Sequence, residues 1–523
     1  MVEKLTASNT SYDSGLKKAQ EKLLIHSLET LAGDVALAFL DLRTRQQHVK
    51  SHPIFSVNVP IDQFESSLAK VLGNLRPQTV LICDDIILLE WAKRYMLDLN
   101  FPEPIVVPGG FKNWCSQGLP YWGGEYTASK AFGEWVEKTG EIDLITPQSA
   151  MWQSADLQLD VRPEEEFRKF SLPQSMHCPT GRIGAIKTSA NLIYMHCAGR
   201  TRGIIAAQTW KDLDRPERSR FIAGGTQGWE LAGGIRSFDN EVKPIAFLTH
   251  EEEQTLAESL LTRLSIPICT KNSLPAWQVS HQSAFHIRVM ECSRDGHTIS
   301  PTTIIQSTDQ FLAAHHISIL IHGPKPLDVA VATTWLRRLG WDAYPLLDDL
   351  GIPESLAKKI TRTTANVPKA VKLVDTRPSQ QYSESRVQGS VWSQRSELQN
   401  LNKQTAIFLI DANAAILDGT INLAKLVGLN VLGGVSWDQL DPSIIDNSTV
   451  VFDVTPTDQP IFFPNRHKGN LKDAQGYLDW EHSLLPALER FGPIPWAPIN
   501  RQSPRPKSHL GIFYRQVRTQ WTK

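Results

Sequence analysis

The strongest constraint on the fold is a pattern that recurs four times along the 523 residues. Each copy opens with a short apolar run, typical of a buried strand, that leads into an Asp-x-Arg or His-x-Arg tripeptide. The tripeptides occupy residues 41–43, 160–162, 286–288 and 375–377. About 36 to 42 residues after each tripeptide begins, a second apolar run ends at Cys83, Cys197, His322 or Asp411. Four near-equal separations indicate one repeated structural unit.

A glycine pair followed by a tryptophan closes the unit in three copies. The pairs begin at Gly109, Gly224 and Gly433, and an Asp348-Asp349 pair stands at the corresponding place in the third copy. A stretch with helical character lies between the second apolar run and each pair. Strand, helix and strand at this spacing predict βαβ units with parallel sheets, so the expected fold class is α/β.

The repeats predict tandem α/β domains, each a parallel sheet flanked by helices. We place them at residues 1–126, 127–245, 246–355 and 356–460, followed by a terminal amphipathic helix and basic tail at 461–523. The last 23 residues carry six Lys or Arg and no acidic residue. We expect this tail to be solvated or loosely docked rather than an arm that binds nucleic acid.

Composition narrows the class of protein. The 54 basic and 55 acidic residues leave a net charge of −1, which provides no global field for binding nucleic acid or an anionic membrane. Six cysteines without a Cys-x-x-Cys pair favour neither a disulfide scaffold nor a zinc site, and we expect no metal or cofactor. The N-terminal stretch lacks the apolar region of a signal peptide, and no apolar run is long enough to span a membrane. The expected class is a cytoplasmic multidomain protein.

Only in the second repeat does the strand end carry a cysteine followed by a short basic loop, a combination typical of a reactive thiol. Cys197 is followed by the loop Ala198, Gly199, Arg200, Thr201, Arg202 and Gly203, and then by a helical stretch. A thiol in this position lies beneath the free backbone N–H groups of a helix N-terminus, and the two loop arginines add positive charge. Both effects favour the thiolate. We therefore expect Cys197 to have a lowered pKa and to be nucleophilic near neutral pH.

The other strand ends lack a cysteine followed by a basic loop. Cys83 is followed by two aspartates, whose negative charge raises the pKa of a thiol, so we expect a packed and unreactive cysteine. His322 and Asp411 offer no thiol, and we interpret His322 as a structural histidine. The Asp-x-Arg pairs persist where the cysteine loop is missing. Asp160 and Arg162 are therefore predicted to be structural, and Trp114, Trp229 and Trp437 are predicted to be core aromatics.

The Asp-x-Arg strand, the cysteine loop and the Gly-Gly…Trp ending together resemble the landmarks of the rhodanese family, arranged as four tandem domains. In that family a cysteine and the residues after it cradle a persulfide. The resemblance implies sulfur transfer, in which Cys197 attacks the outer sulfur of a donor such as thiosulfate, releases sulfite and holds a persulfide. The acceptor would be a thiol, cyanide or a protein.

The resemblance also assigns roles around Cys197. The amides of residues 198–203 stabilise the anion, while Arg200 and Arg202 orient the charged end of the donor. An inactive first repeat is expected to pack against the active second one, with repeats three and four as a second, inactive pair.

Three alternatives stay open. A non-catalytic scaffold or sulfur carrier would receive its persulfide from a partner protein. A phosphatase of this fold carries His-Cys-x5-Arg, but the sixth residue after Cys197 is Gly203, so the loop is one residue short and the phosphatase reading is disfavoured. Cys178 could resolve the persulfide as a disulfide, although an incidental cysteine is the favoured interpretation.

Overall fold

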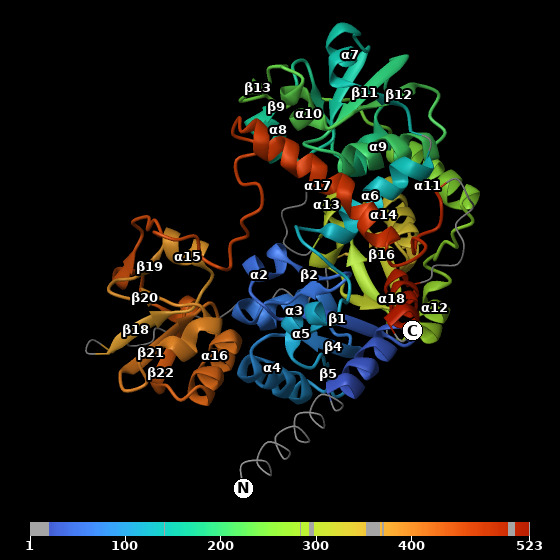
Figure 1. The fold of residues 1–523 in the computed structure, drawn as a ribbon. Coiled ribbons are helices and arrows are strands. Elements are labelled where there is room, and N and C mark those ends of the chain that lie inside the picture. Colours follow the sequence, from blue (N-terminus) through green and yellow to red (C-terminus); the bar gives the residue numbers. More distant parts are fainter. Residues whose placement is uncertain are drawn as a thin grey trace, which may run out of the picture. The chain divides into compact units, whose positions relative to one another are not determined.

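The computed structural model describes residues 20–140, 142–282, 284–291, 298–351, 367–368, 371–499 and 508–521. Within them, strands and helices alternate along the chain as the sequence predicts (Figure 1). The chain divides into two compact units. One holds the described residues of Met1–Glu125, Leu312–Ala314 and Glu354–Phe462, and the other those of Tyr126–Phe311, His315–Pro353 and Phe463–Lys523.

The first unit therefore contains repeats one and four, and the second unit contains repeats two and three with the C-terminal segment. The expected pairing of the first repeat with the second is not the grouping found. The four predicted domain boundaries stay predictions.

The first repeat forms a buried parallel sheet. Its strands are β1 (Leu37–Asp41), β3 (Val57–Asn58), β4 (Gln78–Ile82) and β5 (Ile105–Val106). β1 pairs with β3 and β4, and β4 pairs with β5. The helices are α2 (Arg45–Lys50), α3 (Phe64–Leu72), α4 (Ile86–Asp98) and α5 (Gly110–Ser116). All five residues of β1 are buried, which explains why this run reads as continuously apolar.

The fourth repeat, in the same unit, has the strand order β20-β18-β21-β22. These strands are β18 (Lys372–Asp375), β20 (Val391–Trp392), β21 (Ala406–Asp411) and β22 (Asn430–Ser436), with helices α15 (Ser379–Glu384) and α16 (Ala414–Leu426). Gly433 and Gly434 lie inside β22 and not in a turn before a helix. In this copy the strand leads into a short 3₁₀ helix (Trp437–Gln439) instead of the α-helix that follows the glycine pair in the first two repeats.

The second repeat forms a five-stranded parallel sheet with the order β10-β8-β11-β12-β7. Its strands are β7 (Leu144–Ile145), β8 (Leu157–Asp160), β10 (Met176–His177), β11 (Leu192–His196) and β12 (Arg218–Ile222). The helices around it are α6 (Thr127–Gly140), α7 (Pro147–Trp152), α8 (Glu164–Lys169), α9 (Thr201–Asp212) and α10 (Gly225–Leu231). β11 lies at the centre and carries the candidate cysteine just beyond its last residue.

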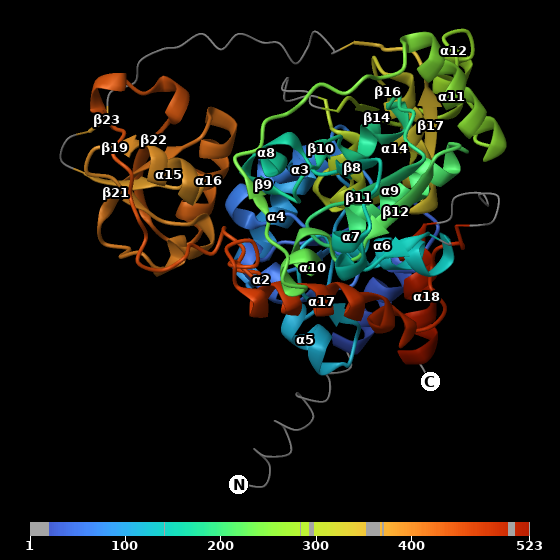
Figure 2. The ribbon, with the colours of Figure 1, turned by 90° about the horizontal axis from the view of Figure 1, so that it is seen from above.

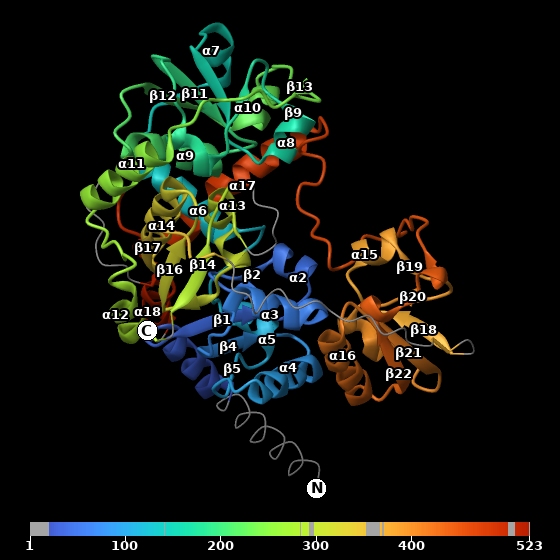
Figure 3. The same cartoon turned by 180° about the vertical axis from the view of Figure 1, so that it is seen from behind.

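The third repeat has the parallel order β14-β16-β17, and Figure 3 shows β14 beside β16. Its elements are β14 (Phe285–Arg288), β16 (Ser318–His322) and β17 (Asp342–Leu346), with α11 (His250–Arg263), α12 (Leu274–Ser280), α13 (Pro301–Gln306) and α14 (Pro326–Arg338). Within the second unit α14 contacts the second repeat, where Trp335 Nε1 donates to Thr209 Oγ1 of α9 at 2.9 Å.

The C-terminal segment contains α17 (Leu471–Glu489) and α18 (His509–Trp521). The sequence predicts α17, which packs on α6 and α10, and Figure 2 shows it running along α10. The expectation of a loosely docked tail is wrong for α18, because Leu510, Phe513 and Tyr514 are buried. Basic residues on its other face hide this apolar stripe in a simple charge count. Within the described residues, no helix is both long enough and apolar enough to cross a membrane.

The Asp-x-Arg pairs are structural, as the sequence predicts. Asp160 and Arg162 are fully buried, and the guanidinium binds the carboxylate through two nitrogens. Arg162 also donates to the carbonyl of Phe170, eight residues further on. Arg43 and Arg377 make the same pair of contacts, to their own aspartate and to the carbonyl eight residues on. The pair thus ties a strand end to the loop that follows it.

The third repeat replaces this pair with another. His286 stands where the other copies have aspartate, and Arg288 instead binds Asp349 through two nitrogens at 2.9 and 2.7 Å. Asp349 belongs to the acidic pair that replaces the glycines. Two departures from the repeat therefore compensate for each other. Among the tryptophans, Trp114 and Trp229 are buried, whereas Trp437 is half-buried beneath the guanidinium of Arg377.

Candidate functional site

Cys197 follows β11 directly, at the carboxyl edge of the second sheet, where sites of open α/β sheets lie. Its side chain is buried, with the residue 1% exposed, and the backbone N–H of Gly203 favours the thiolate and lowers its pKa. Arg200 is the N-cap residue of α9, and Thr201 is the first residue of that helix. The cysteine therefore lies at the N-terminus of α9, as the sequence predicts.

The first turn of α10 holds the loop from the opposite side. Thr226 and Gln227 donate their backbone N–H groups to the carbonyls of Cys197 and Ala198 at 2.9 and 3.1 Å. Gly225 has a positive φ of 55°, and a Cβ there would lie 2.2 Å from the carbonyl oxygen of Cys197. Glycine is thus required by both conformation and space.

The two loop arginines are engaged by carboxylates. Arg200 donates to both oxygens of Glu134 at 2.7 and 2.8 Å and also to Glu137. Arg202 binds both oxygens of Glu166 at 2.5 and 3.0 Å. These are bidentate, charge-assisted pairs, and they offset the positive charge expected around the thiol. The glutamates precede the arginines by 36 to 66 residues in the sequence. The i, i+3 spacing of Glu134 and Glu137 does indicate two carboxylates on one face of a helix, but it does not indicate which cation they bind.

The expectation of a lowered pKa for Cys197 is wrong. Burial raises the pKa of this thiol and outweighs the opposing effects of the Arg202 charge and the Gly203 N–H. The Glu481 carboxylate raises it further. The physical reason is desolvation, because a thiolate enclosed by protein loses the hydration that stabilises its charge in water.

Helix α17 supplies two side chains to the site that no sequence pattern indicates. A Cβ on Gly199 would lie 2.7 Å from Glu481 Oε2 and 3.2 Å from Tyr477 Cε1, so both side chains lie against the loop. Glu481 Oε1 accepts from the Thr201 hydroxyl at 3.3 Å and lies 3.4 Å from Lys130 Nζ. Glu481 follows Thr201 by 280 residues, and no local sequence pattern connects the two.

The strand end of the first repeat agrees with its predicted inactivity. Cys83 is 5% exposed, and burial, together with the charges of Asp41, Asp85 and Asp84, raises its pKa to about 12. In the third repeat, His322 is buried with Nδ1 3.5 Å from Asp349, which fits its structural interpretation.

The fourth strand end is also structural. Asp411 accepts hydrogen bonds from the hydroxyls of Thr376 and Thr420 at 2.8 and 2.6 Å.

All five cysteines in the described residues are free thiols, and Cys292 lies outside those residues. Cys178 is buried with its sulfur 3.9 Å from the Pro179 carbonyl oxygen, and its role as a resolving thiol stays a prediction. Burial raises the pKa of Cys115 and Cys269.

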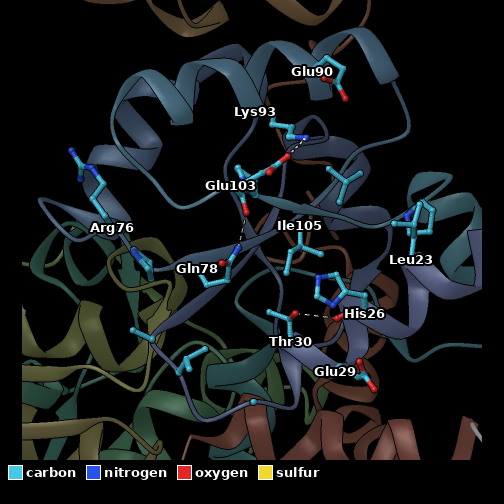
Figure 4. A pocket seen from close by; sticks show the side chains of 17 residues that line it. Leu23, His26, Glu29, Thr30, Arg76, Gln78, Glu90, Lys93, Glu103 and Ile105 are labelled. Carbon is cyan, nitrogen blue, oxygen red and sulfur yellow. Dashed lines mark hydrogen bonds and ion pairs between the residues drawn. The ribbon is translucent and has the colours of Figure 1, made fainter.

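The first unit also has a cavity of about 1150 Å³ (Figure 4). It borders the helical residues 20–31 and the edge strand β5, and its wall includes Gln78, the first residue of β4. An ion pair between Lys93 and Glu103, 2.9 Å apart, lies along it. Because its wall includes the amino end of β4, it is not the carboxyl-edge position of a candidate site.

Comparison with known proteins identifies the fold. Residues 24–117 match the family model of the rhodanese-like domain. The structure is similar to that of a thiosulfate sulfurtransferase from Pseudomonas aeruginosa, with a TM-score of 0.72 and 19% identity, over 88% of this chain and 96% of that one. No curated protein matches the sequence at a significant level. The chain thus has the rhodanese fold, and its first repeat contains a rhodanese-like domain.

Two further solved structures match shorter parts. A possible tyrosine phosphatase of unknown function from Rhodopseudomonas palustris is 23% identical, over 21% of this chain and 93% of that one, with a TM-score of 0.18. SseA from Escherichia coli, a 3-mercaptopyruvate sulfotransferase, is 11% identical, over 39% and 96%, with a TM-score of 0.19.

Proposed function

We propose that the protein is a sulfurtransferase that moves a sulfane sulfur from a small donor to a thiophilic acceptor through a persulfide on Cys197. The observation that carries this proposal is the surroundings of the thiol at the end of β11. Both described cysteine strand ends have a following helix N-terminus and a backbone N–H that favours the thiolate, from Gly203 at Cys197 and from Asp85 at Cys83. Only at Cys197 is the leading nearby charge a cation, that of Arg202. We further propose four tandem rhodanese-like domains, of which only the one at 127–245 is active, in a cytoplasmic protein.

The transfer has two balanced steps. The sulfur of Cys197 attacks the outer sulfur of thiosulfate, a new S–S bond forms, and the S–S bond of the donor breaks with its electron pair leaving on sulfite. Cyanide or a thiol then takes the outer sulfur and returns Cys197 as thiolate. The Gly203 N–H stabilises negative charge on the sulfur throughout.

A sulfur carrier that receives persulfide from a protein partner is the second candidate. The 1% exposure of Cys197, its raised pKa and the paired state of Arg200 and Arg202 favour slow turnover with thiosulfate. A carrier has the same property, because it needs no efficient reaction with a small donor.

Mass spectrometry of the intact protein separates the two functions. We expect thiosulfate or 3-mercaptopyruvate to add the mass of one sulfur atom to the wild type and to Cys83→Ser but not to Cys197→Ser. Uptake from a persulfidated protein alone, with none from either small donor, would support the carrier. Sulfur uptake that survives Cys197→Ser would refute both functions.

A further inference from the structure

The loop around Cys197 has a carboxylate against it that the sulfur-transfer chemistry does not require. We propose that Glu481 of α17 is a specificity-determining residue, which selects sulfane donors with at most one negative charge and discriminates against doubly charged thiosulfate. The inference rests on the proposed sulfurtransferase function and concerns the donor class of the same site.

Glu481 is fully buried at the loop. It is 0% exposed, and its Oε2 atom has no hydrogen-bond partner among the residues that the structure describes. This oxygen lies against Gly199, where a Cβ would meet it at 2.7 Å. A buried carboxylate oxygen without a partner is costly to maintain, and no hydrogen bond compensates the negative charge that it presents to the loop.

The charges around the loop do not favour a dianion. Arg200 is bound by two glutamates and Arg202 by one, so each guanidinium already has a carboxylate partner. Lys130 is buried, and its ammonium group lies 3.4 Å from Glu481. The remaining interaction of Glu481 with an incoming anion is repulsive, and it is twice as large for a charge of −2 as for −1.

The electrostatic effect of Glu481 already reaches the reacting atom. Its carboxylate raises the pKa of Cys197, whereas Lys130 lowers it. A group that acts on the sulfur of Cys197 also acts on a donor whose outer sulfur touches that atom. Because a change in the thiol pKa affects every donor alike, the ratio between two donors isolates the effect on donor charge.

Thiosulfate and methanethiosulfonate form a suitable pair of donors, with charges of −2 and −1. In the second case the Cys197 thiol attacks the outer sulfur, the donor S–S bond breaks, methanesulfinate leaves with the electron pair, and the proton stays on the persulfide. Cyanide then removes the outer sulfur as thiocyanate and regenerates the thiol. Both donors are thus followed by the same product.

The test compares kcat/KM for the two donors in wild type, Glu481→Gln and Glu489→Gln. We expect wild type to prefer methanethiosulfonate. Glu481→Gln should raise the thiosulfate to methanethiosulfonate ratio about tenfold, equivalent to about 1.4 kcal/mol for one unit of donor charge. Glu489 lies on the same helix but is exposed and bound to Lys138 at 2.7 Å, so its variant should leave the ratio unchanged.

Lys130→Met provides a variant of opposite sign if Glu481→Gln does not fold. It removes the cation beside Glu481 and should lower the ratio about threefold. A wild type that uses both donors equally, or a ratio that neither variant moves, overturns the role of Glu481 while leaving sulfur transfer intact. Failure of both donors to form thiocyanate or to load Cys197 instead overturns the proposed function.

Discussion

The strand ends of the first and second repeats place a cysteine at the same position and surround it differently. Cys83 and Cys197 each follow the central parallel strand, are at most 5% exposed, and have a pKa raised by burial. Burial therefore does not distinguish a candidate active cysteine from an inactive one. Next to burial, the main charge acting on Cys197 is that of Arg202, whereas the largest charges acting on Cys83 are those of three aspartates.

The helix after the glycine pair binds a different group in each of the two repeats. In the second repeat, the second and third amides of α10 bind the carbonyls of the cysteine loop. In the first repeat, the equivalent amides of α5, those of Phe111 and Lys112, bind the Asp84 carboxylate at 2.7 and 3.1 Å. One aspartate side chain thus occupies the helix N-terminus that holds the loop in the other copy. The two sites therefore share the strand, the Asp-x-Arg pair and the glycine-pair helix, and they differ in the segment that follows the cysteine.

The largest effect should be on activity. Cys197→Ser should lower cyanide-dependent thiocyanate formation by about a thousandfold or more, because a serine hydroxyl cannot form the persulfide. Cys83→Ser should retain wild-type turnover, since its thiol has a pKa of about 12 and lies among carboxylates. The assay uses the donor that loads the wild type. Equal losses in the two variants would remove the functional difference between the strand ends.

Loss of the buried Asp-x-Arg ion pair should lower stability equally in both repeats. Arg162→Leu and Arg43→Leu each leave a buried aspartate without its cation, and each should lower the free energy of unfolding by about 3–5 kcal/mol. Urea unfolding followed by circular dichroism measures the loss, with Arg168→Leu, an exposed arginine on α8, as the control. A loss at only one repeat would contradict a common structural role.

Alanine variants of Gly110 and Gly225 should lose stability equally but differ in their effect on activity. A Cβ at Gly225 would lie 2.2 Å from the Cys197 carbonyl oxygen, and one at Gly110 would lie 2.4 Å from that of Cys83. Both residues also have positive φ, so each alanine variant should cost about 2 kcal/mol through strain and backbone displacement. Only Gly225→Ala should also slow sulfur uptake by Cys197. Mass spectrometry of the two variants at one time point checks this difference.

Local patterns predicted much of the frame. The apolar runs before residues 41, 160 and 375 are strands, and the helical stretches that include α4, α14 and α17 lie where periodicity places them. The position of Cys197 at a helix N-terminus also followed from sequence order, because a strand, a short loop and a helix leave little freedom in where the cysteine lies.

The electrostatics of the site could not be predicted from the loop alone. The charges of Arg200 and Arg202 were visible, but their partners on α6 and α8 are remote in sequence, and Glu481 is 280 residues from Thr201. The sign of the Cys197 pKa shift depends on these partners and on complete burial. Both arise from tertiary packing, which a pattern of neighbouring residues does not encode.

The smallest effect concerns the pH dependence of stability, and it sharpens the comparison between the two thiols. Below the unfolded-state pKa of about 9, Cys83 is protonated in both the folded and the unfolded state and adds no pH dependence. Above it, the unfolded chain loses this proton while the folded chain keeps it up to about pH 12, so the free energy of unfolding falls as pH rises through this window. The loss amounts to about 1.4 kcal/mol at pH 10.

Cys83→Ala should therefore flatten the decline of the free energy of unfolding between pH 8 and 10, measured by urea unfolding. Cys197→Ala should flatten it less, because Arg202 and the Gly203 N–H oppose the effect of burial there. Equal flattening by the two variants would mean that the charges around the two thiols do not distinguish them in the folded protein.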